Sequence, residues 1–193
     1  MGFNQKNLWV RSLLVLVLFV STSGAIRVEH LHRQSNLTPK KFSRLFSEFD
    51  WVLFHRVQQP NDFLRSKKGD CDDFACLADE VLIPKGFETR LIHVQLVGMV
   101  SHAVCYVTED RAYLDYNNRS HFFTLTKSGP SLRDIASRVA RSLNANWTAA
   151  FRLDFSYSEH LKTITAKVVR TQDPSTHPPP GKAAPRHNPF HVE

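Results

Sequence analysis

The sequence lacks the motifs of several familiar binding sites. It has no Gly-rich phosphate loop, no cysteine or histidine pairs at zinc-ligand spacing, and no internal repeat. These absences exclude a P-loop nucleotide site, a zinc-finger-type centre and a repeat architecture. The chain has 193 residues, of which 42% are apolar and 22% charged. This composition is typical of one globular domain with a real core.

Cysteine is also scarce, with three residues at positions 71, 76 and 105. Three cysteines cannot all pair within one chain, so at least one is a free thiol or bonds to a partner. Within a helix, Cys71 and Cys76 would lie on different faces and too far apart for a disulfide. Cys105 could reach Cys76 if its strand packs on that helix, but two buried thiols are the preferred interpretation.

No apolar run is long enough to span a membrane. The run from Leu13 to Val20 falls well short of the roughly 20 residues that a spanning helix needs. Basic residues precede it and small residues ending at Ala25 follow it, an order typical of a signal peptide. We therefore expect residues 1–25 to be removed and the protein to be exported, periplasmic or secreted, without a stable membrane span. The alternative is an uncleaved anchor, in which Arg11 would lie inside the span.

The net charge of +7 points to no particular partner. Lysines and arginines are scattered, and the densest pairs, Lys40–Lys41 and Lys67–Lys68, lack the interleaved aromatic residues of a nucleic-acid platform. We therefore expect no nucleic-acid partner. The segment 171–193 is rich in proline and is predicted to be a disordered tail, which leaves residues 26–170 as the folded domain.

The pattern along this domain mixes helix and strand signals. Thr38 followed by Pro39 predicts a helix start, and Ser131 opens another helix with a capping-box pattern. Alternating segments around Ser158–Leu161 predict a hairpin. Further strands are expected after the turn at Pro84–Gly86, on both sides of Thr108–Arg111, and at Phe122–Leu125.

The stretch KGDCDDFACLADEVL, residues 68–82, places a cysteine in the first turn of a predicted helix. Gly69 is expected to allow a sharp turn into this helix, and Asp70 to cap it. The helix dipole favours a thiolate at Cys71, but the neighbouring aspartates oppose one. Helix position alone therefore leaves open whether Cys71 is reactive or only a small buried residue.

A base for this cysteine emerges from the register of the predicted hairpin. If the strands pair through a two- or four-residue loop, Tyr106 faces Tyr113 and Val104 faces Asp115. His102 shares a face with Val104, so its side chain can reach Asp115 diagonally. If this face lies over the start of the Cys71 helix, the three residues form a nucleophile, a base and an orienting carboxylate. A three-residue loop would place Asp115 on the wrong face.

The segment from Pro60 to about Asn118 resembles the core of the transglutaminase-like superfamily, most closely the bacterial transglutaminase-like cysteine proteinases. It carries GDCDDFA on the nucleophile helix, a glycine and then Arg90 toward the next strand, and HAV and LD on the last two strands. The resemblance implies an α+β, papain-like core with the nucleophile helix packed on an antiparallel sheet, as a catalytic domain over residues 26–170. It implies that Cys71 is the nucleophile, His102 the base and Asp115 the orienting residue.

The resemblance also suggests residues around this triad. An upstream side chain would help the Cys71 N–H bind the oxyanion, and the candidates are Gln58, Gln59 and Trp51. Some exported relatives bind calcium through acidic residues beside the cysteine, which here would be Asp70 and Asp72, although helix capping alone explains both. The chemistry itself requires no cofactor. Tyr116 departs from the pattern, because bacterial relatives often have asparagine directly after the third catalytic residue.

The expected function is therefore that of an exported thiol hydrolase, a cysteine peptidase or amidase. Its substrates would be proteins or peptides, including those of the cell envelope, and the reaction would pass through an acyl-enzyme. A transglutaminase-type acyltransferase is the first alternative, because the same intermediate can pass to an amine. The second is a non-catalytic binding module on the same fold, against which the intact set of Cys71, His102 and Asp115 argues.

Overall fold

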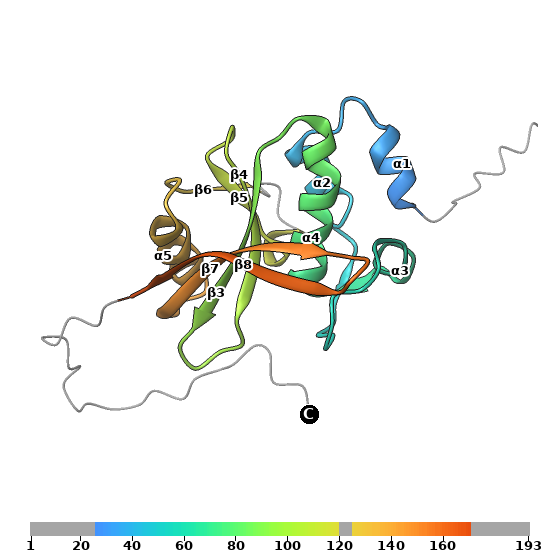
Figure 1. Ribbon diagram of the computed structural model, residues 1–193. Coiled ribbons are helices and arrows are strands. Elements are labelled where there is room, and N and C mark those ends of the chain that lie inside the picture. The colour runs from blue at the N-terminus through green and yellow to red at the C-terminus, as the bar shows by residue number, and fades with distance from the viewer. Residues whose placement is uncertain (1–25, 120–124, 171–193) are drawn as a thin grey trace, which may run out of the picture.

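The computed structural model describes residues 26–119 and 125–170 (Figure 1). The helices are α1 (Val28–Arg33), α2 (Pro39–Arg44), α3 (Pro60–Ser66), α4 (Cys71–Leu82) and α5 (Leu132–Ser142), with 3-10 turns η1 (Ile83–Lys85) and η2 (Tyr116–Asn118). The strands are β1 (Asp50–Trp51), β2 (Lys68–Gly69), β3 (Thr89–Leu96), β4 (His102–Val107), β5 (Ala112–Leu114), β6 (Leu125–Lys127), β7 (Trp147–Ser156) and β8 (Leu161–Val169).

Six strands form one antiparallel sheet in the order β6-β5-β4-β3-β7-β8, and β1 pairs with β2 in a separate parallel ladder. The central strand β3 pairs with β4 on one side and with β7, much later in the chain, on the other. Helix α4 packs on β3 and β4. The α+β class, with the cysteine helix on an antiparallel sheet, is confirmed.

The sheet is covered on both faces, with α4 on one side and α5 on the other (Figure 1). On the α4 side, six buried rings form an aromatic cluster with neighbouring centroids 4.8 to 6.0 Å apart. Its members are Phe42, Phe46, Phe49, Phe63, Phe74 and Tyr116. Because Phe74 lies on α4 and the others precede or follow it, the cluster fixes this helix from several sides.

Several local predictions are confirmed. The Thr38 side chain accepts from Lys41 N at the start of α2, and β7 and β8 form the predicted hairpin. Helix α2 ends at Arg44, and Phe46 and Phe49 beyond its end are still buried. Leu125 does begin a sheet strand, β6, whereas residues 122–124 lie outside the described residues.

The predicted signal segment 1–25 and the predicted tail 171–193 also lie outside the described residues. Within residues 26–119 and 125–170, no helix has the length and apolar character needed to cross a membrane. Cys76 and Cys105 are both buried and form no disulfide with each other. This agrees with the two buried thiols preferred in the sequence analysis. Burial raises the pKa of both thiols well above the usual value, which favours their neutral form.

Candidate active site

A capping box fixes the start of α4. The Asp70 side chain accepts hydrogen bonds from the N–H groups of Asp72 and Asp73, at 2.9 and 3.3 Å. Asp73 Oδ2 in turn accepts from Asp70 N at 3.1 Å. These reciprocal bonds satisfy N–H groups that the first helical turn leaves unpaired. Cys71 is thereby held as the first residue of the helix.

The same two carboxylates also hold the segment that precedes α3. Phe54 N donates to Asp70 Oδ2 at 2.9 Å, and Gln58 N donates to Asp73 Oδ1 at 2.7 Å. Burial raises the pKa of Asp73 to about 6, against the lowering effect of the Gln58 donors. The buried carboxylates thus tie the 54–58 segment to the helix start beside Cys71.

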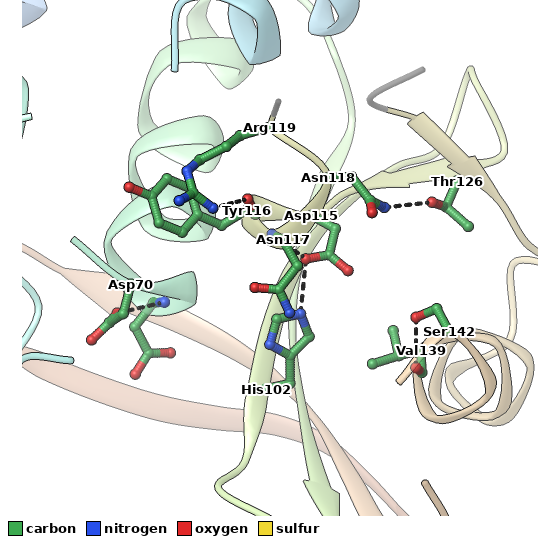
Figure 2. Close-up of polar contacts among 11 residues, drawn as sticks. Asp70, His102, Asp115, Tyr116, Asn117, Asn118, Arg119, Thr126, Val139 and Ser142 are labelled. Carbon is green, nitrogen blue, oxygen red and sulfur yellow. Dashed lines mark hydrogen bonds and ion pairs between the residues drawn. The ribbon is translucent and has the colours of Figure 1, made fainter. Parts of the chain in front are cut away.

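The hairpin of β4 and β5 has the predicted register. Tyr106 pairs with Tyr113, and Arg111 N donates to Thr108 O at 3.1 Å to close the turn. His102 is the first residue of β4, and Asp115 directly follows β5. Their side chains point toward each other, as Figure 2 shows. His102 Nε2 lies 2.9 Å from Asp115 Oδ1.

The route from this pair to Cys71 differs from the predicted one. Val104 and Tyr106 pack with α5, whereas Ala103 and Cys105 face α4, so the predicted face does not lie over the cysteine helix. His102 instead approaches Cys71 at the end of its strand, next to the β3–β4 turn. Cys71 is close enough to the His102 ring to raise the pKa of the histidine, and both residues line one cavity. The strand end, rather than the sheet face, brings the three side chains together.

The environment of the histidine favours its charged form. His102 exposes 6% of its surface and Asp115 only 1%. Burial alone would lower the pKa of His102, but the Asp115 charge and hydrogen bond, together with Cys71, outweigh it and raise the pKa well above the usual value. Asn117 N also donates to Asp115 Oδ1 at 2.9 Å (Figure 2). The carboxylate is therefore fixed in position toward the ring.

Lys162 enters the site from the hairpin of β7 and β8, and no local sequence pattern indicated it. Its Nζ lies 2.6 Å from Asp72 Oδ2, in the first turn of α4. Burial lowers the pKa of Lys162, but Asp72 outweighs this effect and raises it, so the lysine is a cation here. The acidic flank of Cys71 is consequently less negative than the sequence alone suggested.

The cavity at Cys71 has a volume of about 80 Å³, enough for several water-sized groups. Its polar lining consists of Asp70, Cys71, Asp72, Ser101, His102 and Asn117. Its apolar lining consists of Trp51, Leu53, Phe54, Leu96, Met99, Val100 and Leu143. The cavity thus has a reactive polar side and an apolar side.

The three oxyanion candidates have different places in the structure. Trp51 lines the cavity. Gln58 Nε2 donates to Lys68 O and Asp73 Oδ2, each at 2.8 Å, and supports the helix start instead. Gln59 Nε2 donates to Tyr157 O at 3.1 Å, on the β7–β8 turn. Of the three, Trp51 is the one that the structure brings beside Cys71.

The carboxylates suggested for calcium are engaged by protein donors. Asp70 accepts from three backbone N–H groups, and Asp72 is paired with Lys162. In the described part of the chain, no group of three histidine, cysteine or acidic residues gathers in a geometry that would hold a metal ion. With both carboxylates occupied in this way, these residues do not fit the oxygen-rich ligand set that calcium takes.

Comparison with known proteins gives one result for this region. The sequence pattern of a family described as Transglutaminase-like domain matches residues 25–126. The matched stretch contains Cys71, His102 and Asp115, and it ends within β6. No curated protein matches the chain.

Proposed function

The chain belongs to the transglutaminase-like domain family, and from this premise we propose that it is a thiol hydrolase, a cysteine peptidase or amidase. One observation carries the proposal: a buried His102–Asp115 pair, 2.9 Å between Nε2 and Oδ1, lies on the same cavity as Cys71. A cysteine, a histidine and a carboxylate in this order of contact are the parts of an activated nucleophile.

In the proposed reaction, the Cys71 thiol passes its proton to His102, and the sulfur attacks a peptide or amide carbonyl carbon. The carbonyl oxygen becomes an oxyanion, and the imidazolium then donates its proton to the leaving nitrogen as the C–N bond breaks. Water deprotonated by His102 next attacks the thioester, and its C–S bond breaks to release the acid and the thiol. Asp115 orients the ring and stabilises its charge throughout.

Two donors are proposed for the oxyanion. Cys71 N–H lies in the first turn of α4, where backbone donors lack helical acceptors and the helix dipole favours negative charge. The Trp51 side chain, on the same cavity, is the proposed second donor. Neither donor needs a metal ion to act.

Hydrolysis and acyl transfer share the acyl-enzyme and differ in whether water or an amine resolves it. The resemblance of the Pro60–Asn118 segment to bacterial cysteine proteinases, which are hydrolases, favours water. A purely binding module has no physical need for a buried histidine and carboxylate held beside a thiol. We therefore favour a hydrolase over an acyltransferase and over a binding module.

The proposal predicts that His102→Ala slows alkylation of Cys71 by iodoacetamide at pH 7. The expected loss is about 30-fold, because an unassisted thiol is only a few per cent ionised at this pH. Mass spectrometry at timed intervals measures the rate at each cysteine separately. His160→Ala, which removes a histidine on the exposed β7–β8 turn, serves as the control and should leave the rate unchanged. Equal rates in His102→Ala and the parent protein would remove His102 from the mechanism.

We also propose that the enzyme is exported after removal of residues 1–25. The basic start, short apolar run and small residues before Ile26 support this interpretation. N-terminal sequencing of protein recovered from outside the cytoplasm is expected to begin at Ile26. Recovery of a chain that retains Met1 in a membrane fraction would make the segment an anchor instead.

A further inference from the structure

Exposed apolar side chains gather beside the candidate nucleophile. In the described part of the chain, nine large hydrophobic residues are exposed. Five of them lie in only two segments, 52–54 after β1 and 97–100 in the β3–β4 turn. Single exposed hydrophobic residues are normal, but several together at a cavity mark a binding surface.

Both segments reach the cavity at Cys71. Leu53, Phe54, Met99 and Val100 line it, and we call these four residues the apolar wall. Leu53 is 57% exposed and Val100 is 59% exposed, so both have surface left for a ligand to cover. Covering apolar surface is favourable roughly in proportion to its area.

The acidic groups that line the cavity do not compete with this surface. Asp70 is 4% exposed and is bound to backbone donors, and Asp72 is paired with Lys162. A charged substrate side chain placed against the apolar wall would lose water without gaining a partner there. An uncharged, apolar group suits this position best.

We propose that the apolar wall is a substrate subsite that accepts an aliphatic or aromatic side chain next to the carbonyl attacked by Cys71. The wall shares its cavity with Cys71 and His102, so a group seated on it lies within a few bonds of the reacting carbon. The substrate class is thus a peptide-type acyl donor with an apolar residue at the reaction centre. This inference rests on the proposed function, because it assumes that Cys71 is the nucleophile.

The test compares two electrophiles that differ only in their tail, iodoacetamide and N-hexyl-iodoacetamide. The rate ratio of the two at Cys71 is divided by the same ratio for N-acetylcysteine in solution. The parent protein is expected to favour the hexyl reagent by about tenfold, since burying only two or three methylene groups suffices for this factor. A normalised ratio near one would overturn the subsite.

The double variant Leu53→Ser/Val100→Ser is expected to bring the normalised ratio close to one. Ile83→Ser is the matched control, because Ile83 is 53% exposed but lies after the far end of α4. It should keep the full preference for the hexyl reagent. A double variant that also kept the preference would contradict the proposal.

The two proposals fail in distinguishable ways. A Cys71 that reacts no faster than N-acetylcysteine with iodoacetamide rejects the thiol hydrolase, whatever the tail preference. A fast reaction without a tail preference rejects only the subsite. The single variant Val100→Ser repeats the comparison and gives a result even if the double variant does not fold, because this side chain is the most exposed of the four.

Discussion

Asp115→Ala is expected to lower turnover by about 10⁴-fold, the loss typical of a triad whose orienting carboxylate is removed. Asp115 Oδ1 holds His102 Nε2 at 2.9 Å, and without it the ring can rotate and take the wrong tautomer. Asp115→Asn keeps the shape of the side chain but should still lose most of the rate, because an amide stabilises an imidazolium poorly. Substrate binding is expected to change little.

Turnover and thermal midpoint measured on the same samples separate this role from a structural one. Asp115 also accepts from Asn117 N at 2.9 Å, so it caps η2. If capping were its whole role, both variants would lose stability and keep their rate. Asp134→Asn, at the capped start of α5, is the control for loss of a capping carboxylate away from Cys71. Until a substrate is known, the alkylation rate of Cys71 replaces turnover.

Gly69→Ala is expected to destabilise the protein by about 1–3 kcal/mol and to slow Cys71 alkylation. A Cβ atom at this position would lie 2.6 Å from Phe63 Cδ2 and 2.7 Å from Asp73 Oδ2. Phe63 belongs to the aromatic cluster, and Asp73 closes the capping box of α4, so neither can move without disturbing the helix start. Denaturant unfolding and timed mass spectrometry measure the two effects.

Gly86→Ala provides the matched comparison. Gly86 has φ +87° and open space where a Cβ atom would lie, so alanine there causes backbone strain of about 1 kcal/mol but no clash. It should lower stability without changing the reactivity of Cys71. If Gly69→Ala behaved in the same way, the close packing at Gly69 would be irrelevant to the site.

The features predicted correctly from the sequence depend on short-range geometry. The cap at Asp70 and the pairing of Tyr106 with Tyr113 each follow from a few neighbouring residues. Gly69 shows the limit of such reasoning. It was expected to provide a turn, but it is not among the positive-φ glycines, and its lack of a side chain instead admits the Phe63 ring.

The features that the sequence did not predict depend on how distant segments pack. Alternation along β4 correctly separated its two faces, but it could not say which face α4 would cover. The ion pair of Asp72 with Lys162 joins residues that are 90 positions apart. The Gln58 amide, suggested as an oxyanion donor, binds Asp73 because the 54–58 segment folds back on the helix start. Such contacts can be identified only once the tertiary fold is known.

The position of β3 between β4 and β7 has a consequence for the growing chain. When the ribosome has completed β6, the whole family-matched segment has been made, yet one edge of β3 still lacks its neighbour. Asp72 likewise lacks its ion-pair partner until Lys162 is made, and Lys162 is among the last described residues. Long-range pairing of this kind forms late and slowly. A nascent chain therefore carries Cys71 well before the ion pair of Asp72 with Lys162 can form beside it.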